Sequence, residues 1–276
     1  NYLNELKKRN IPSLLISARF YAEQIYFKAW ARWAKKLLFL VDRILVQDSI
    51  SKGLLESIEY KNVELTGDTR YDRVDELSRN KDHFPLIESF IGSKKVFIAG
   101  SSWPLDEKVI IPYMLNSKHD IKYIIAPHDV GSEHINSLIN KCGAMAITYS
   151  RIHELSDEKI LIIDGIGMLS RLYKYAAISY IGGAFKEGLH NILEPASYGL
   201  PVITGPHHKG FLEGPEMEAA GALFKVNDAN DFASIMDRLL ENMQVYTKAS
   251  HAAKAFISDN KGASKKTSII IEAYLN

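Results

Sequence analysis

Between residues 96 and 226 the chain repeats one pattern, in which a short and mainly apolar run is followed by a stretch with helical character. The runs expected to form strands are residues 96–99, 121–126, 144–147, 160–163, 178–181, 202–204 and 223–226. Short apolar strands that alternate with helices are typical of a parallel sheet covered by helices on both faces. The sequence therefore predicts an α/β fold with a doubly wound sheet, and such sheets bind ligands at the carboxyl ends of their strands.

The first part of the chain carries a shorter version of this pattern. Strands are expected at residues 11–17, 43–47 and 63–66, with helices at 20–40 and 50–57. Residues 72–84 are polar, have little β-character and end at Pro85, so they are predicted to link two domains. The sequence thus predicts a first domain over residues 1–84, a second over 85–260 and a last helix over 261–276.

The composition is that of a globular protein and excludes several classes. Of the 276 residues 46% are hydrophobic, enough to build a sizeable core. The formal net charge of +1 argues against a protein held to nucleic acid by its overall charge. The single cysteine, Cys142, allows no internal disulfide and no cysteine metal cluster, which favours a cytosolic location. No apolar run approaches the roughly 18 residues of a membrane-spanning helix, and no signal peptide is recognisable.

The most informative strand end is the stretch 182–195, which reads Gly-Gly-Ala-Phe-Lys-Glu-Gly-Leu-His-Asn-Ile-Leu-Glu-Pro. A strand is expected to end in a flexible loop here, and a helix to begin near Asn191 with Pro195 in its first turn. The free N–H groups of that turn favour a phosphate, while Glu194 offers a carboxylate to hydroxyl groups. A simple capped helix is the alternative, because Asn191 with Glu194 three residues later resembles a capping box.

Two further strand ends carry polar residues. Ser101 and Ser102 precede Pro104 and are expected either to hold a phosphate or carboxylate or to cap the helix that follows. His128, directly after Pro127, is placed to donate to a phosphate oxygen or a leaving group. An inert surface histidine is the alternative interpretation of His128.

Two glycine-rich or histidine-rich turns complete the set. In the run 164–168, Gly165 and Gly167 allow a ligand to approach the backbone closely, or simply form a tight turn. His207 and His208 follow the strand expected at 202–204, but adjacent histidines without supporting carboxylate or cysteine spacing do not indicate a metal site. No nucleophile elbow, Walker loop or dinucleotide-binding glycine motif is present.

The helix expected over residues 20–40 combines basic and aromatic side chains. At helical spacing it carries Lys28, Arg32, Lys35 and Lys36 beside Tyr26, Trp30, Trp33 and Leu37. Such a helix is either a solvated basic face over an ordinary core stripe, or a surface for an anionic amphiphile or the headgroup zone of a membrane.

Taken together, these motifs resemble the Kdo transferases, which move 3-deoxy-D-manno-octulosonic acid (Kdo) from its CMP-activated form onto the lipid A precursor. The motifs that carry the resemblance are Gly182-Gly183, residues 190–196, 199–202 and 205–207, then Asp164–Gly167 with Leu172-Tyr173, Ala126-Pro127-His128, Ser17-Ala18-Arg19 and Gly67-Asp68. The resemblance implies a GT-B architecture of two Rossmann-like domains, the first binding the acceptor and the second the nucleotide sugar, with the last helix crossing back to the first.

The resemblance also implies roles for individual residues. Glu194 would hold the ribose hydroxyls, and the turns at Asn191 and 165–168 would meet the phosphate and the base. The residues expected at the CMP-Kdo site are Ser101, Ser102, Pro127, His128, Gly165, Ile166, Gly167, Met168, His190, Asn191 and Glu194. The acceptor is expected to meet Arg19, Lys28 and Arg32. No metal or other cofactor is expected.

The chain departs from the family pattern in three places. The family usually has Pro-Arg-His where Pro127 is followed directly by His128, and a glutamate where Met168 stands. The glutamate that serves the family as general base lies in a glycine-rich segment, which is absent here and is expected upstream of Asn1. Because the chain does not begin with methionine and residues 3–9 look like the second half of a helix, the first domain is expected to be incomplete.

The resemblance predicts an inverting transferase of lipopolysaccharide biosynthesis. Its expected partners are a CMP-sugar donor, a phosphorylated lipid A precursor and the membrane surface, at the cytoplasmic face of the bacterial inner membrane, with no role for nucleic acid. The alternatives are a GT-B transferase or nucleotide-sugar epimerase that uses a UDP- or CDP-linked donor, and a nucleotide-binding fragment without activity of its own. A membrane-surface scaffold built on residues 20–40 is a third alternative.

Overall fold

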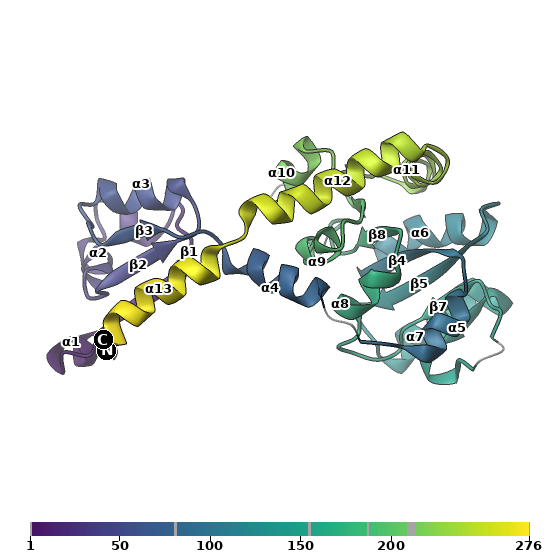
Figure 1. The fold of residues 1–276 in the computed structure, drawn as a ribbon, viewed down its shortest axis with the longest axis horizontal. Coiled ribbons are helices and arrows are strands. Elements are labelled where there is room, and N and C mark those ends of the chain that lie inside the picture. Colours follow the sequence, from purple (N-terminus) through teal and green to yellow (C-terminus); the bar gives the residue numbers. More distant parts are fainter. Residues whose placement is uncertain (1, 80–81, 154–155, 187, 209–212, 276) are drawn as a thin grey trace. The chain divides into compact units, whose positions relative to one another are not determined.

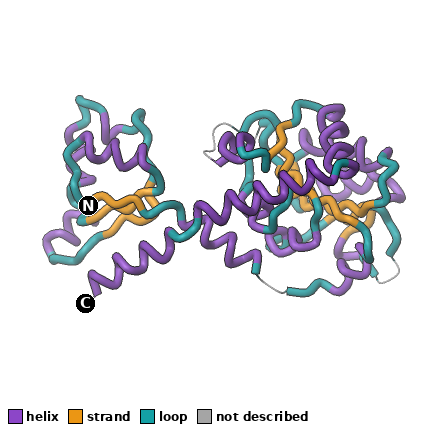
Figure 2. The backbone as a smooth tube through the Cα atoms, turned by 45° about the horizontal axis from the view of Figure 1, so that its top comes forward, coloured by secondary structure: helices purple, strands orange, loops and turns teal. Residues whose placement is uncertain are grey.

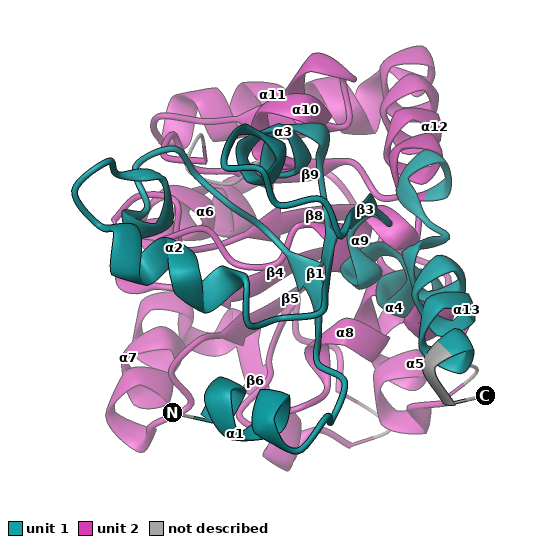
Figure 3. Ribbon diagram, turned by 90° about the vertical axis from the view of Figure 1, so that its left-hand side faces the viewer, with its two compact units in different colours: residues 1–75, 258–276 teal, residues 76–257 magenta. Residues whose placement is uncertain are grey.

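The computed structural model describes residues 2–79, 82–153, 156–186, 188–208 and 213–275. The chain forms two compact units, unit 1 with residues 1–75 and 258–276, and unit 2 with residues 76–257 (Figure 3). Each unit has its own parallel sheet (Figure 2). The predicted α/β class is therefore confirmed for both parts of the chain.

Unit 1 contains a three-stranded sheet in the order β1-β2-β3. All three strands were expected; they are β1 (Leu14–Ala18), β2 (Arg43–Val46) and β3 (Val63–Leu65). The central strand is the most apolar, and its residues Ile44, Leu45 and Val46 are fully buried. The helices of this unit are α1 (Tyr2–Lys8), η1 (Ile25–Phe27), α2 (Arg32–Leu38), α3 (Ser49–Ser57) and α13 (Ala263–Leu275), with the first part of α4 (Thr69–Ser78).

The prediction of one long helix over residues 20–40 is wrong. The segment contains only the single turn η1 and the seven-residue helix α2. The reason is packing, because Phe20 is buried and meets the rings of Tyr26 and Phe27 edge-on, with centroids 6.2 and 5.8 Å away. Folding the chain back to make this cluster stabilises unit 1 more than a continuous helix with the same spacing would.

The polar linker expected over residues 72–84 is partly helical. Helix α4 runs from Thr69 to Ser78, and its buried residues Tyr71 and Val74 are three apart on one face. At its start the Asp68 carboxylate accepts a hydrogen bond of 2.9 Å from the Arg70 N–H. The two units divide within this helix, after residue 75. A boundary of the functional domains between residues 84 and 85 stays a prediction.

Unit 2 contains a seven-stranded sheet in the order β10-β9-β8-β4-β5-β7-β6, and every strand pair is parallel. All seven expected strands are present: β4 (Lys95–Ser102), β5 (Ile121–Pro127), β6 (Ala146–Thr148), β7 (Ile160–Ile162), β8 (Ile178–Ile181), β9 (Val202–Thr204) and β10 (Leu223–Lys225). The connecting helices are α5 (Pro85–Ile91), α6 (Pro104–Asn116), α7 (Ser132–Cys142), η2 (Gly143–Met145), η3 (Tyr149–Arg151), α8 (Leu169–Leu172), η4 (Tyr173–Tyr175), α9 (Leu193–Ser197), α10 (Glu213–Ala219), α11 (Ala229–Glu241) and α12 (Met243–Asn260).

The direction in which the chain crosses this sheet changes at β4. From β4 the chain builds β5, then β6 at the edge of the sheet, and then β7 between β5 and β6. It afterwards builds β8, β9 and β10 on the other side of β4, so that β4 lies between β8 and β5 (Figure 1). Doubly wound sheets bind ligands at the carboxyl ends of their strands where the winding direction reverses. The fold therefore places a binding edge after β4 and β8, whose residues Gly100 and Ile181 are register partners.

The core of unit 2 is held by aromatic residues from the sheet and from α11. Phe232 of α11 meets Phe97 and Tyr180 edge-on, with ring centroids 5.7 and 6.0 Å away, and Phe97 in turn meets Tyr123. All four side chains are fully buried. Edge-to-face contacts of this kind fix the ring positions, so the sheet supports its strand ends rigidly. Among the described residues, no helix combines the length and the apolar character needed to cross a membrane.

Candidate functional site

Three aromatic rings gather after β4, β5 and β8. The His128 ring stacks on that of Trp103, with centroids 4.4 Å apart, and on that of His190, at 4.7 Å. The indole Nε1 of Trp103 donates a hydrogen bond of 3.0 Å to Nε2 of His190. The structure therefore brings together two residues that the sequence predicted at the donor site, His128 and His190, and adds Trp103, to which no role was assigned.

A buried carboxylate connects the two central strand ends. Asp106, in the first turn of α6, accepts hydrogen bonds from the Trp103 N–H at 2.9 Å, the Gly183 N–H at 2.9 Å and the Tyr180 hydroxyl at 2.6 Å. Its side chain is fully buried. Asp106 thereby fixes the loop after β4 against the loop after β8. Burial, and then the nearby Asp106 carboxylate, raise the pKa of Tyr180 well above its ordinary value, which keeps its hydroxyl a donor.

The loop after β8 passes so close to β4 that it needs glycine. A Cβ on Gly182 would lie 2.3 Å from the Ser101 carbonyl oxygen and 2.7 Å from the Asp106 carboxylate. Gly183 has a φ of +95°, and a Cβ there would lie 2.1 Å from the Gly188 carbonyl oxygen. The Gly182-Gly183 pair is therefore explained by close packing of backbone and by a left-handed conformation.

Ser101 and Ser102 differ in what they offer a ligand. Ser101 has a φ of +51°, which is strained for a residue with a Cβ, and it is partly exposed. Ser102 is buried, and its hydroxyl donates to the Glu107 carboxylate at 3.4 Å. Neither serine caps α6, whose N-cap is Trp103. The capping alternative for these serines is therefore wrong, and of the two residues only Ser101 is partly exposed.

The turn before α9 is fixed by Asn191. Its side-chain oxygen accepts a hydrogen bond of 3.1 Å from the Leu193 N–H, and its amide nitrogen donates to the Glu194 carboxylate at 3.1 Å. The helix begins at Leu193, slightly later than expected, and Pro195 lies in its first turn as predicted. The N-cap of α9 is Ile192 and not Asn191 as expected. Asn191 instead closes the turn before the helix, and its amide orients the carboxylate of Glu194.

The glycine turn at 165–168 reaches the same edge through α8. Gly165, Ile166 and Gly167 are exposed, Ile166 with 84% of its surface, and Met168 precedes the first turn of α8. The Tyr198 hydroxyl, from the residue after α9, donates to the Ser170 carbonyl at 3.0 Å. This contact places α8 beside α9.

Helix α8 and the residues that follow it lie close to Gly100 of β4. A Cβ on Gly100 would lie 2.1 Å from the Tyr173 hydroxyl and 3.0 Å from the Leu169 side chain. Burial, and then the nearby Glu194 carboxylate, raise the pKa of Tyr173 well above its ordinary value. The structure thus connects the glycine turn, Glu194 and the end of β4.

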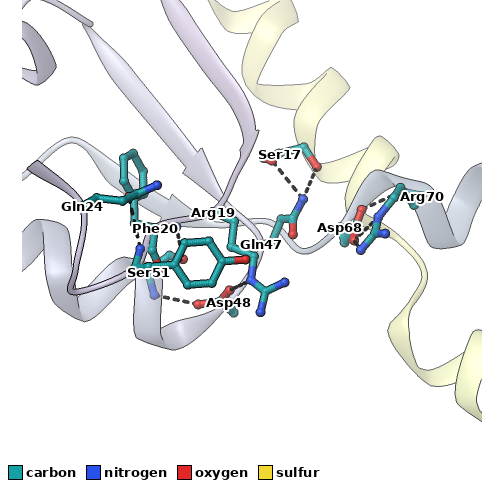
Figure 4. A network of polar contacts seen from close by, with 10 residues as sticks. Ser17, Arg19, Phe20, Gln24, Gln47, Asp48, Ser51, Asp68 and Arg70 are labelled. Carbon is teal, nitrogen blue, oxygen red and sulfur yellow. Dashed lines mark hydrogen bonds and ion pairs between the residues drawn. The ribbon is translucent and has the colours of Figure 1, made fainter. Parts of the chain in front are cut away.

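Arg19 in unit 1 belongs to a polar network at the carboxyl ends of β1 and β2 (Figure 4). Its guanidinium lies 3.6 Å from the Asp48 carboxylate and 4.9 Å from the centre of the Tyr21 ring. The neighbouring Gln47 side chain donates to the Ser17 carbonyl at 3.0 Å. The network holds Arg19 at a strand end of unit 1, where its predicted contact with the acceptor stays a prediction.

Lys28 and Arg32, the other predicted acceptor contacts, lie on the surface between η1 and the first turn of α2. Both are exposed, as are Trp30 and Trp33, which expose 74% and 60% of their surfaces. Large exposed tryptophans beside cations are unusual for a solvated face. We call these four residues the tryptophan-lysine surface.

The two histidines after β9 differ in exposure. His208 is buried and its Nε2 pairs with the Glu218 carboxylate at 2.7 Å, while His207 is exposed and its backbone N–H donates to the Ala184 carbonyl at 2.9 Å. Within the ranges that the structure describes, no three His, Cys, Asp or Glu side chains gather as metal ligands would. The expectation of a metal-free reaction stays a prediction.

Sequence reasoning missed the roles of Trp103 and Asp106. Asp106 is the third residue of α6 and accepts a hydrogen bond from the N-cap residue, as an acidic residue in a capping box does. That spacing is a local signal for the helix start. No local signal connects Trp103 with His190, because 87 residues separate them.

Sequence comparisons find several similar proteins that share one description. A family model described as 3-deoxy-D-manno-octulosonic-acid transferase (kdotransferase) matches residues 1–73. A 3-deoxy-D-manno-octulosonic acid transferase of Rickettsia felis is 30% identical over 215 residues, which are 72% of this chain and 44% of that protein. The protein of the same name from Haemophilus influenzae is 27% identical over 290 residues, covering 100% of this chain and 67% of that protein. This chain is related to the Kdo transferases.

The chain spans about half the length of several of these Kdo-transferase relatives. Among solved structures, the C-terminal CMP-Kdo binding domain of WaaA from Acinetobacter baumannii has a TM-score of 0.54 and 19% identity, covering 66% of this chain and 95% of that one. UDP-GlcNAc 2-epimerase from Neisseria meningitidis bound to UDP-GlcNAc has a TM-score of 0.66 and 18% identity, covering 99% and 72%. These similarities confirm the predicted GT-B fold class.

The close approach at Gly182 makes a testable prediction about this edge. We expect Gly182→Ala to destabilise unit 2 by about 3 kcal/mol, because its methyl group overlaps backbone that cannot move without disturbing Asp106. Urea unfolding followed by tryptophan fluorescence measures the change. Gly165→Ala is the matched control, since a Cβ there meets nothing within 4 Å, and equal loss in the two variants would contradict the close-packing argument.

Proposed function

We propose that this chain is part of an inverting glycosyltransferase that moves Kdo from CMP-Kdo to a phosphorylated lipid A precursor in lipopolysaccharide biosynthesis. The observation that supports it is the gathering of the resembling motifs at one sheet edge. The loops that carry His128, His190 and Glu194 follow neighbouring strands or pack against them. This edge lies where doubly wound sheets bind nucleotides.

The edge offers the groups that a CMP-linked sugar acid needs. Glu194 supplies a carboxylate for the ribose hydroxyls, held in place by Asn191. The Ser101 hydroxyl and the rings of His128 and His190 supply hydrogen bonds for the phosphate and the carboxylate of Kdo. Burial, and then the neighbouring His128, lower the pKa of His190, so His190 serves as a neutral donor near pH 7.

In the proposed reaction a general base takes the proton of the acceptor hydroxyl as its oxygen attacks the anomeric carbon of Kdo. The bond from that carbon to the phosphate oxygen breaks, and CMP leaves with the bonding electrons. Oriented N–H and O–H donors at the sheet edge stabilise the developing phosphate charge. The proposed base is the glutamate of the family's glycine-rich segment, and the proposed scheme uses no metal.

The acceptor side of the proposal rests on unit 1. The tryptophan-lysine surface combines cations, which suit the phosphates of a lipid A precursor, with tryptophan rings, which favour the headgroup zone of a membrane. Arg19 adds a third cation at the strand ends. We therefore propose that unit 1 meets an anionic lipid at the cytoplasmic face of the inner membrane.

A second candidate function is an epimerase or a transferase that uses a UDP-linked sugar. It is favoured by one observation, because the Neisseria meningitidis epimerase matches the fold over 99% of this chain. The fold alone does not select the nucleotide. The choice between the two candidates depends on which nucleotide the edge of unit 2 binds.

Nucleotide preference tests the proposal directly. We expect CMP at about 100 times its dissociation constant to stabilise the chain by about 2.7 kcal/mol, and UDP at the same concentration to stabilise it far less. Differential scanning fluorimetry measures both, in buffer with and without EDTA. A clear preference for UDP favours the second candidate, and a CMP effect that EDTA abolishes contradicts the metal-free scheme.

Removing the Glu194 carboxylate tests the assignment of the ribose contact. We expect Glu194→Ala to reduce kcat/KM for CMP-Kdo in the complete protein by about 100-fold, because two charge-assisted hydrogen bonds are lost. CMP binding by the 276-residue chain, measured by calorimetry, should weaken in parallel. Glu216→Ala on the exposed face of α10 is the control. Unchanged kinetics in Glu194→Ala would remove this residue from the site.

Charge reversal tests the acceptor side. We expect Lys28→Glu with Arg32→Glu to weaken binding to vesicles of phosphatidylglycerol about 30-fold, since each cation near an anionic surface contributes about 1 kcal/mol. Co-flotation of the chain with the vesicles measures the change. Lys265→Glu with Lys266→Glu, two exposed cations of α13 in the same unit, is the control. Equal losses in both double variants would show a general charge effect without a defined surface.

A further inference from the structure

The hydrogen bond between Trp103 and His190 fixes more than the position of the two rings. Indole Nε1 carries a proton and has no lone pair to accept with, so it can only donate. Since Nε2 of His190 lies 3.0 Å from it, that nitrogen must be the acceptor and cannot carry a proton. The single proton of neutral His190 is therefore on Nδ1.

The surroundings hold Trp103 in the orientation that this bond requires. Its backbone N–H donates to the buried Asp106 carboxylate, and Pro104 begins α6 directly after it. The planes of the Trp103 and His190 rings differ by only 12°, as expected for a hydrogen bond in the ring plane. The ring of His128 stacks on both partners and covers the pair.

Among the described residues, Nδ1 of His190 has no hydrogen-bond partner and is available to a ligand. His190 is half-buried, and within the described part of the chain its ring makes no hydrogen bond besides that from Trp103. Its backbone N–H donates to the carbonyl of Gly182, which anchors His190 to the start of the loop that leads to α9. An N–H donor without a partner is thus held at the edge where the sugar nucleotide is proposed to bind.

We propose that Trp103 is a positioning residue of the donor site, which locks His190 in the neutral Nδ1–H tautomer so that its ring donates a hydrogen bond to an anionic oxygen of the nucleotide sugar. The inference rests on the proposed function for the identity of the ligand, but not for the tautomer. Locking the tautomer in advance removes the cost of selecting it when the ligand binds.

The charged groups around His190 are consistent with this role. His128 stacks on its ring, and a positive charge there opposes a second one on His190. The Asp106 carboxylate lies nearby but already accepts from the Trp103 and Gly183 N–H groups and the Tyr180 hydroxyl. Burial and His128 both lower the pKa of His190, which favours the neutral ring.

The tautomer is measured without any ligand. In long-range ¹H–¹⁵N spectra of the 276-residue chain, we expect Nδ1 of His190 to show the shift of a protonated nitrogen and Nε2 that of an unprotonated one. Trp103→Phe keeps an aromatic ring but removes the donor, so the His190 signals should move toward the Nε2–H tautomer. Trp33→Phe, at an exposed tryptophan of unit 1, is the control and should leave them unchanged. An Nε2–H tautomer in the unaltered chain overturns the proposal.

Amide substitutions at position 190 separate this role from simple packing. The amide of His190→Asn places an N–H near the position of Nδ1, whereas that of His190→Gln reaches the position of Nε2. We expect His190→Asn to bind CMP-Kdo about 10-fold more tightly than His190→Gln, and Trp103→Phe to weaken binding about 10-fold, with thermal unfolding showing that the variants remain folded. Equal affinities for the two amide variants contradict the proposal.

The two hypotheses fail in different ways. If the unaltered chain shows the Nδ1–H tautomer but binds neither CMP nor CMP-Kdo, the proposed function is contradicted and the fixed tautomer is not. If CMP-Kdo binds but Trp103→Phe changes neither the tautomer nor the affinity, the positioning role of Trp103 is contradicted and the proposed function is not.

Discussion

The donor edge of unit 2 depends on the hydrogen bonds of one buried carboxylate. Asp106 is fixed by its place in the first turn of α6, and it binds Gly183, which lies 77 residues further along the chain. A carboxylate buried without partners would be costly, so the Trp103 N–H, the Gly183 N–H and the Tyr180 hydroxyl stabilise it as much as it positions them. Loops are the mobile parts of most binding sites, and here the two central loops are held to a rigid helix.

The glycines of the second loop follow from this attachment. For its N–H to reach Asp106, Gly183 must pass the end of β4 at a distance where a side chain on Gly182 would overlap the Ser101 carbonyl. The close approach brings His190 under the ring of His128 and beside Trp103. The glycine pair, the buried carboxylate and the three aromatic rings are therefore one structural arrangement, in which each part requires the others.

The sequence predicted the sheet well because its strands are buried. Runs such as Ile178–Ile181 are apolar throughout or nearly so, and that signal is local. Residues 20–40 show the limit of local patterns, because the Phe20 ring cluster outweighs a helical spacing that many amphipathic helices share. The helix in the polar segment at 72–84 was missed because its apolar pattern is weak. Helix α4 has only two buried residues, both on one face.

The site was predictable to the extent that strand ends converge in a parallel sheet. That rule identified His128 and Glu194 as candidates, the family resemblance added His190, and the topology brings the loops that carry them to neighbouring strand ends. The rule does not identify which side chains touch, because the Trp103–His190 bond spans 87 residues and requires the loop path that Asp106 and Gly182 impose. Residues that position a site are hard to find in one sequence for this reason.

The chemistry of this edge differs from what a cluster of cations would provide. The family usually has an arginine between the two residues that stand here as Pro127 and His128, and His190 is held neutral by burial and by His128. On the proposed function, the charge of the departing phosphate is therefore met mainly by oriented neutral donors, among them Nδ1–H of His190 and the Ser101 hydroxyl. Such donors stabilise the developing charge better the more firmly they are oriented in advance, because they then need no free energy of reorganisation during the reaction. The buried network beneath the rings is thus as important to the proposed reaction as the groups that touch the ligand.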